Sequence, residues 1–297
     1  MRIVIYRILL AAFLILFAIS SFFIGKQLYE KNKAISEFST ISSILSEKRE
    51  AIEAQQRHDK SNDQANSFGN NDYITNGKLQ SDSSDYGSNG YSIRDASGNE
   101  ERIDPRLEAL RELRDEYPDF IGWIRISGTM IDYPVMQTPR FPEFYLNRSF
   151  FRQRSNHGTP FLDYLCDAAK PSDNMIIYGH NMNDGTMFAD LEQYKDKEFY
   201  ELHSVIEFDT VYEIGRYEVI AVFLGDFTVN GLEAFGYHHY SEFANEAEFN
   251  DYMRQVDARR LHESKAELFY GDRFLTLSTC EYTTQNSRMV VLARKLP

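Results

Sequence analysis

The chain has 297 residues, and its 32 Lys and Arg against 45 Asp and Glu give a formal net charge of −13. This length accommodates one or two domains, and an acidic balance without basic runs argues against nucleic-acid binding, which needs clustered Lys and Arg. The two cysteines, Cys166 and Cys280, are too few for a disulfide scaffold. Because no Cys/His cluster has zinc spacing, we expect neither a metal site nor a cofactor.

The N-terminal segment has the composition of a membrane anchor. Residues 8–25 (ILLAAFLILFAISSFFIG) carry no charge, which is close to the shortest run that spans a bilayer core of about 30 Å. Residues 1–7 contain Arg2 and Arg7, and positive charge before a span favours a cytoplasmic N-terminus. A cleaved signal peptide is the alternative, because residues 18–20 loosely resemble a cleavage site, but the length of the apolar run favours an uncleaved anchor.

Two polar segments follow the anchor. Within residues 26–57, the apolar residues from Ile35 to Leu45 have a spacing close to i, i+3, i+4. This pattern is typical of a helical stalk beside the membrane or a short coiled coil, and a frayed polar helix fits it equally well. Residues 58–102 are rich in Ser, Asn, Asp and Gly. Such a segment buries too little apolar surface to offset the entropy of ordering, so it predicts a disordered linker.

Residues 103–297 have the pattern of a folded domain. Leucines at helical spacing predict a helix over 105–117, and an amphipathic segment with a capping box at Asn245 and Glu248 predicts another over 241–262. Short β-branched and aromatic runs predict strands at 120–126, 130–136, 175–180, 205–214, 216–227, 273–280 and 288–295. Many short strands with few helices predict a mostly β domain, either a barrel or a sandwich.

Three residues lie where predicted strands begin or end, and their types suit acyl transfer. Cys280 ends the run TLSTC, His180 ends MIIYGH, and Arg288 opens RMVVLARK. A hairpin joining the first and last of these runs would return Arg288 to the side of Cys280. A thiolate can attack an acyl carbon, an imidazole can carry the proton to a leaving amine, and a fixed cation can stabilise an oxyanion. Taken alone, such a cysteine is more often a small buried apolar residue than a nucleophile, such a histidine more often a hydrogen-bonded structural residue, and such an arginine more often a surface charge.

The blocks around these residues resemble the sortases, the transpeptidases that attach surface proteins to cell walls in Gram-positive bacteria. TLSTC at 276–280 is similar to the TLxTC signature of that family, and IIYGHNM at 176–182 and SRMVVLARK at 287–295 match two further blocks in the expected chain order. The likeness covers most of residues 107–295. It implies a closed β-barrel of about eight strands, with N-terminal helices before it and a helix inserted before the cysteine strand.

The resemblance also implies roles for individual residues. Cys280 is the expected nucleophile, His180 its acid/base partner and Arg288 the cation on the oxyanion side. The long segment between His180 and Cys280 favours class B over the more compact class A, and the only tryptophan, Trp123, does not fit the plug motif of class C. Supporting roles are expected for three groups in the same block, namely Ser278, Thr279 and the backbone N–H of Glu281.

Several other residues have no assigned role in this interpretation. Cys166 matches no family motif and is expected to be a partly buried spectator. The pair His238 and His239 is expected to be solvated or to lie at the rim of the groove rather than to bind a metal. Three acidic residues are candidates for orienting His180, and the sequence does not choose among them: Asp184, Asp190 and Asp226.

The resemblance predicts a membrane-anchored cysteine transpeptidase on the extracellular face of the plasma membrane. Its expected substrates are surface proteins with a C-terminal sorting motif, and the expected acceptor is an amine of a peptidoglycan precursor. Two alternatives remain open, a thiol endopeptidase that uses the same site and a catalytically silent surface protein that binds peptides.

Overall fold

The computed structural model describes residues 2–69, 93–94, 100–101, 103–226, 235–280 and 287–297. The helices are α1 (Arg2–Gly69), α2 (Pro105–Glu116), α3 (Lys197–Leu202) and α4 (Glu246–Asp257), with 3₁₀ turns η1 (Phe144–Asn147), η2 (Ala189–Lys195) and η3 (Tyr237–His239). The strands are β1 (Ile93–Arg94), β2 (Glu100–Glu101), β3 (Phe120–Arg125), β4 (Asp132–Met136), β5 (Phe161–Leu162), β6 (Asn174–Tyr178), β7 (Val205–Thr210), β8 (Arg216–Asp226), β9 (Phe274–Cys280) and β10 (Ser287–Lys295).

The described part of the chain folds around a closed barrel whose strands lie in the order β10, β8, β7, β3, β4, β5, β6 and β9. The predicted barrel is therefore confirmed. Most neighbouring strands are antiparallel, but β4 runs parallel to β5 and β6 runs parallel to β9. The two-residue strand β5 was not predicted, because a run so short has no periodicity to detect.

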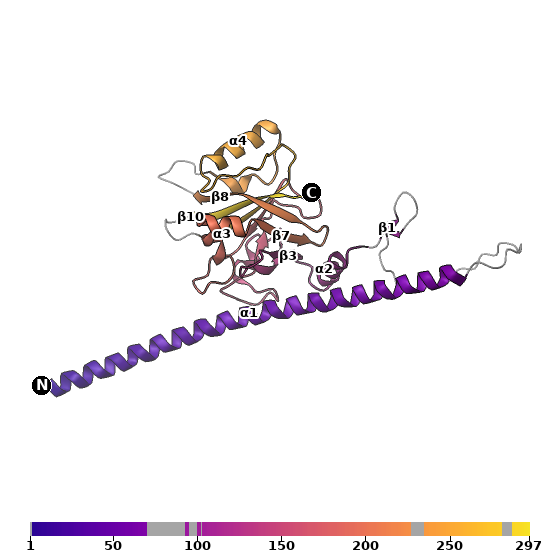
Figure 1. The fold of residues 1–297 in the computed structure, drawn as a ribbon. Helices are drawn as coiled ribbons and strands as arrows, with labels where there is room; N and C mark the ends of the chain where they lie inside the picture. The colour runs from indigo at the N-terminus through magenta and orange to yellow at the C-terminus, as the bar shows by residue number, and fades with distance from the viewer. Residues whose placement is uncertain (1, 70–92, 95–99, 102, 227–234, 281–286) are drawn as a thin grey trace, which may run out of the picture.

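Strand β10 is buried on both faces, which explains its continuous apolar sequence. Met289 and Val291 belong to the core inside the barrel, whereas Val290 and Leu292 pack in a second apolar cluster on the outside of the wall. Helix α4 covers that outer cluster, and it lies on the side of the barrel away from α1 (Figure 1).

The helix predicted at 241–262 is shorter than expected. Helix α4 spans Glu246–Asp257 and begins at Asn245, whose side chain accepts a hydrogen bond from the backbone N–H of Glu248 at 3.0 Å. The carboxylate of Glu248 in turn accepts from the N–H of Ala244 at 2.7 Å. The capping residues therefore set the start of the helix several residues after the beginning of the polar segment.

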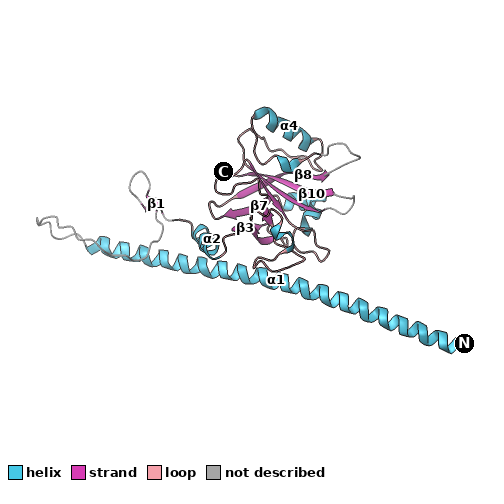
Figure 2. Cartoon of the chain, turned by 180° about the vertical axis from the view of Figure 1, so that it is seen from behind, coloured by secondary structure: helices cyan, strands magenta, loops and turns pink. Residues whose placement is uncertain are grey.

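Helix α1 is a single long rod that passes alongside the barrel and α2 (Figure 2). Its middle section is attached to the domain, because Ala34, Phe38 and Ile41 are buried in the same core as the barrel interior. Ile44 and Leu45 pack against that core from outside it. The apolar stripe predicted for the stalk is thus present, and it contacts the domain of its own chain.

The N-terminal part of α1 extends away from the domain (Figures 1 and 2). Its most apolar window of 18 residues has a mean hydropathy of 2.7 and is 0% buried by the rest of the protein. By length and composition this helix can cross a membrane.

The predicted linker at 58–102 lies mostly outside the described residues. The first part of that range, up to Gly69, continues α1 as helix. The small strands β1 and β2 pair with each other and not with the barrel.

Candidate active site

The register of three neighbouring strands brings the predicted catalytic positions to one end of the barrel wall. Strands β9 and β10 form an antiparallel pair in which Arg288 lies directly opposite Cys280. Residues opposite each other in such a pair lie on the same face of the sheet. The hairpin predicted from the sequence is therefore present. The Cys280 side chain and Glu281 lie outside the described part of the structure.

Strand β6 brings His180 to the same end. Its parallel pairing with β9 places Tyr178 beside Ser278, and the backbone N–H of Gly179 donates to the carbonyl of Ser278 at 3.1 Å. Continuing this register by two residues places the backbone of His180 at the level of Cys280.

A cleft of about 280 Å³ opens at this end of the strands. His180 and Arg288 both line it, and so do Ser278 and Thr279. The remaining lining residues are Pro142, Glu143, Leu146, Phe161, Asp163, Tyr164, Tyr178, Gly179 and His238. The cleft therefore combines an imidazole and a guanidinium with an apolar wall, which is the environment in which a developing charge is stabilised most effectively.

The His180 imidazole is oriented by a backbone group. Its Nε2 lies 2.6 Å from the carbonyl oxygen of Leu146. Because a carbonyl can only accept, Nε2 carries the proton and Nδ1 is left to exchange protons with a reactant. Burial lowers the pKa of His180 below its ordinary value, and the charges of His157 and Arg288 lower it further, whereas the hydrogen bond to Leu146 acts in the opposite direction. The neutral imidazole is thus the favoured form at neutral pH.

Two of the three acidic residues proposed as partners of His180, Asp184 and Asp190, make other contacts. Asp184 accepts a hydrogen bond from Nε2 of His157 at 2.9 Å. Asp190 accepts from the backbone N–H of Met130 at 2.7 Å. The side chain of Asp226 lies outside the described part. Sequence reasoning missed the Leu146 carbonyl, because a backbone acceptor leaves no residue-type signal.

The supporting residues Ser278 and Thr279 are both buried at the cleft wall. The hydroxyl of Ser278 lies 2.7 Å from that of Tyr237, so one donates to the other. The Thr279 hydroxyl has no hydrogen-bond partner among the residues that the structure describes. Ser278 therefore ties the cysteine strand to the outer turn η3, a contact that the sequence did not predict.

The surroundings of the second cysteine, Cys166, make its thiol a poor nucleophile. Cys166 is buried, and its sulfur accepts from the backbone N–H of Ile176 at 3.4 Å. Burial raises the pKa of the Cys166 thiol to about 12. It is more deeply buried than the partly buried spectator that the sequence predicts. Among residues 2–69, 93–94, 100–101, 103–226, 235–280 and 287–297, no cluster of three His, Cys, Asp or Glu side chains is arranged to hold a metal.

Comparison with known proteins identifies the fold and its family. A family model described as the sortase domain matches residues 124–296, which is more than half of the chain and includes all three predicted catalytic positions. The chain belongs to the sortase family.

Two relatives of this sortase are named as class B members. Sortase B of Staphylococcus aureus is 32% identical over 200 residues, which are 67% of this chain and 78% of the relative. Sortase B of Listeria monocytogenes is 35% identical over 191 residues, which are 62% of this chain and 72% of the relative. A solved complex of S. aureus sortase B with substrate aligns with a TM-score of 0.58 at 31% identity, covering 64% of this chain and 85% of that one.

These matches confirm the likeness to class B sortases that the motifs predicted. Membership implies the activity of the family, a cysteine transpeptidase that acts on sorting motifs.

Proposed function

We propose that this sortase is a single-pass membrane protein that uses Cys280, His180 and Arg288 to transfer a surface protein to an amine of a cell-wall precursor. The strand register supports the proposal most strongly, because Arg288 lies opposite Cys280 and His180 follows the strand parallel to β9. His180 and Arg288 line one cleft, and the charge of Arg288 acts on the pKa of His180.

In the first half-reaction, Nδ1 of His180 takes the proton of the Cys280 thiol, and the thiolate attacks the carbonyl carbon of the scissile peptide bond. The guanidinium of Arg288 donates to the oxyanion of the tetrahedral intermediate, with the backbone N–H of Glu281 as a second donor. When the C–N bond breaks, His180 returns its proton to the departing amine. The product is a thioester between Cys280 and the surface protein.

In the second half-reaction, the acceptor amine attacks the thioester carbonyl. His180 takes a proton from the attacking nitrogen, the C–S bond breaks, and the proton passes to the sulfur of Cys280. A new amide bond forms and the thiol is restored. A thiol endopeptidase differs only at this stage, because water replaces the amine.

The proposed location rests on α1. Its exposed apolar window is long enough to span a bilayer, and Arg2 and Arg7 precede the span. This arrangement favours a cytoplasmic N-terminus and a catalytic domain on the cell-wall side. Protease digestion of intact protoplasts should degrade the domain, and an intact domain would contradict this orientation.

The experiment that tests the activity uses the full chain with fluorescent peptides that carry candidate sorting motifs, with and without an oligoglycine or a diamine. A ligated product that depends on the amine supports transpeptidation, whereas cleavage unaffected by the amine identifies an endopeptidase. Replacing Cys280 with Ala should abolish either reaction. A Cys280→Ala protein that still turns over would remove Cys280 from the mechanism, and a wild-type chain that binds peptides without turnover would make it a binding protein.

A further inference from the structure

Two loop segments hold His180 in place. The first contains Leu146, whose carbonyl accepts from Nε2 of His180 at 2.6 Å. The second is the loop that follows His180, which closes on itself because the N–H of Phe188 donates to the carbonyl of His180 at 2.8 Å. An isolated bridge between Asn181 and Met187 pairs the two sides of this loop. The position of the imidazole therefore depends on where both segments lie.

A buried pair joins these two segments. Nε2 of His157, in the segment that follows Leu146, lies 2.9 Å from a carboxylate oxygen of Asp184 in the loop after His180. The side chain of His157 is 3% exposed and that of Asp184 is 9% exposed. Thr186 donates to the other carboxylate oxygen through both its N–H and its hydroxyl. Each oxygen of Asp184 thus has a partner, and the two segments are held as one unit.

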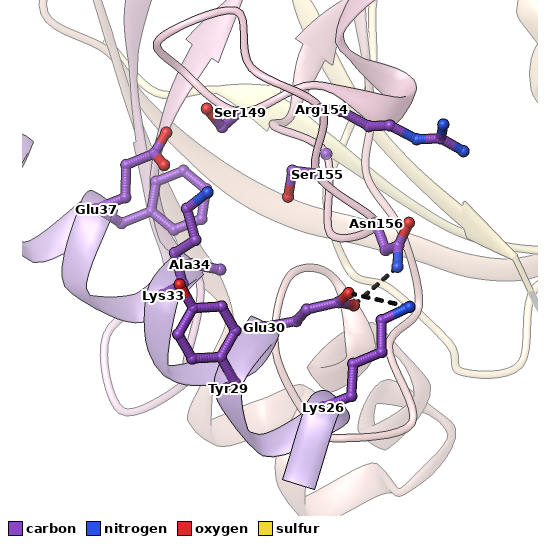
Figure 3. A pocket seen from close by; sticks show the side chains of 12 residues that line it. Lys26, Tyr29, Glu30, Lys33, Ala34, Glu37, Ser149, Arg154, Ser155 and Asn156 are labelled. Carbon is purple, nitrogen blue, oxygen red and sulfur yellow. Dashed lines mark hydrogen bonds and ion pairs between the residues drawn. The ribbon is translucent and has the colours of Figure 1, made fainter. Parts of the chain in front are cut away.

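Helix α1 contacts both segments with adjacent residues. Glu30 accepts a hydrogen bond from the side-chain amide of Asn156 at 2.8 Å, as Figure 3 shows. The ammonium group of Lys31 donates to the backbone carbonyl of Asp184 at 2.7 Å. One turn of the stalk therefore bonds to Asn156, the neighbour of His157, on one side and to Asp184, the hydrogen-bond partner of His157, on the other.

A third contact lies further along the same helix. The ring of Phe38 packs edge-on against that of Tyr133, with centroids 5.0 Å apart. The hydroxyl of Tyr133 accepts from the backbone N–H of Met187 at 3.0 Å. Met187 has a φ of 60°, a conformation that is uncommon outside glycine and asparagine and that surrounding contacts must maintain. Phe38 supports this contact from the stalk side.

We propose that the section of α1 that carries Glu30, Lys31 and Phe38 is a positioning element for His180, so that the stalk holds the catalytic imidazole as well as anchoring the domain. Glu30 and Lys31 bond directly to the two segments that orient the imidazole, and Phe38 reaches the second segment through Tyr133 of β4. None of these stalk residues lines the catalytic cleft. The proposal rests on the catalytic role proposed for His180. A catalytic group displaced by about 1 Å can lose about 100-fold in rate, so a loosened stalk contact should lower turnover without abolishing peptide binding.

The test uses the full chain in detergent and compares kcat and KM for a sorting-motif peptide. Lys31→Met removes the ammonium group and keeps the apolar stem, and we expect it to lower kcat by about tenfold with little change in KM. Combining it with Phe38→Ala should lower kcat further. Lys31→Arg keeps a cationic donor, and we expect it to keep most of the wild-type kcat.

The matched control is Lys48→Met, a change of the same type on the same helix. Lys48 forms ion pairs with Glu112 and Glu116 of α2 at 3.3 Å each, so its loss weakens the attachment of α1 without touching the histidine loop. We expect Lys48→Met to keep the wild-type kcat.

A second readout reports on His180 itself. The groups that act on its imidazole are the Leu146 carbonyl and the charges of His157 and Arg288, and burial lowers its pKa overall. If Lys31→Met loosens the loops, more water reaches His180, and its pKa should rise toward the ordinary value in an NMR titration. Equal kcat and equal His180 titration in Lys31→Met and Lys48→Met would overturn the positioning role. A wild-type chain without turnover would instead refute the proposed function.

Discussion

A single methyl group next to His180, the proposed acid/base residue, provides a demanding test of the site. Gly179 is the residue before His180, and a Cβ placed there would lie 2.6 Å from Cγ of Phe188. Ordinary carbon contacts are about 3.5–4.0 Å, so the methyl is short of room by about 1 Å. Phe188 is fully buried, and its N–H is bonded to the carbonyl of His180. A shift of the Phe188 backbone that relieved this contact would therefore also move the histidine loop.

The expected effect of Gly179→Ala follows from this crowding. Overpacking of a buried site costs about 1–3 kcal/mol, which corresponds to a fall in Tm of about 2–12 °C for a domain of this size. Because Gly179 also donates to the carbonyl of Ser278, the shift should separate β6 from β9 at the level of the active site. We expect a loss in kcat/KM of about 10- to 100-fold.

Thermal unfolding and peptide cleavage by the full chain measure the two effects. Adding Phe188→Leu to Gly179→Ala removes part of the obstructing ring. If the two changes were independent, their free-energy effects on stability and on activity would add. We expect the double variant to be more stable and more active than this sum predicts. The control is Gly25→Ala, since nothing lies within 4 Å of a Cβ at Gly25. Wild-type stability and activity in Gly179→Ala, or strict additivity in the double variant, would refute the crowding argument.

Three further predictions concern ionisable groups. Arg288→Ala removes a positive charge that acts on His180, so the His180 pKa measured by NMR over about pH 4 to 8 should rise toward its ordinary value. Because burial raises the pKa of Cys166 to about 12, a maleimide should label Cys280 in the native protein and reach Cys166 only on unfolding, as seen by mass spectrometry of peptides. Burial raises the pKa of Asp184, but its hydrogen bonds outweigh burial and lower that pKa overall. The ionised carboxylate therefore stabilises the fold above the unfolded pKa of 3.8, and this stabilisation is lost as the pH falls through the folded pKa. Asp184→Asn should accordingly flatten the decrease of Tm in acid.

Each of these predictions has a control. Arg294→Ala, at the far end of β10 where the side chain pairs with Glu218, should leave the His180 titration unchanged. Cys280→Ala should show no labelling before unfolding. Asp184→Glu keeps an ionisable carboxylate and should retain the decrease of Tm in acid. An unchanged His180 pKa in Arg288→Ala, native labelling of Cys166, or a wild-type acid profile in Asp184→Asn would each contradict the corresponding reasoning.

The parts of the fold that the sequence predicts are those with local signals. The run containing Val290 and Val291 is apolar on both faces because the barrel interior and the cluster under α4 bury it from two sides. The capping box at Asn245 and Glu248 was predicted and is present, whereas the predicted extent of 241–262 was too long, because the amphipathic pattern continues past both ends of α4. Strand β5 was missed because two residues are too few to show the alternation of apolar and polar side chains that predicts a strand.

In the candidate site, too, the features with a local sequence signal were predicted and the others were not. Cys280, His180 and Arg288 were predicted from their positions at strand ends and from family motifs. The sequence did not predict the role of the Leu146 carbonyl or the pairing of His157 with Asp184. These contacts join loops that are distant along the chain. They also depend on backbone groups, or on residue types that are common at surfaces. Local patterns thus predict the candidate catalytic residues, and only the folded chain shows which groups contact His180.

The parallel pairing of β6 with β9 explains why the catalytic positions are so far apart in sequence. Adjacent parallel strands need a long connection, and here it consists of β7 and β8, which complete the other side of the barrel, followed by α4, which covers its outer wall. Strand β9 pairs with β6 on one side and with β10 on the other. His180, Cys280 and Arg288 therefore come together only when β6, β9 and β10 are all paired. Peptide cleavage should consequently be lost in any partly unfolded form that has opened the β6–β9 seam, even where most of the strands remain paired.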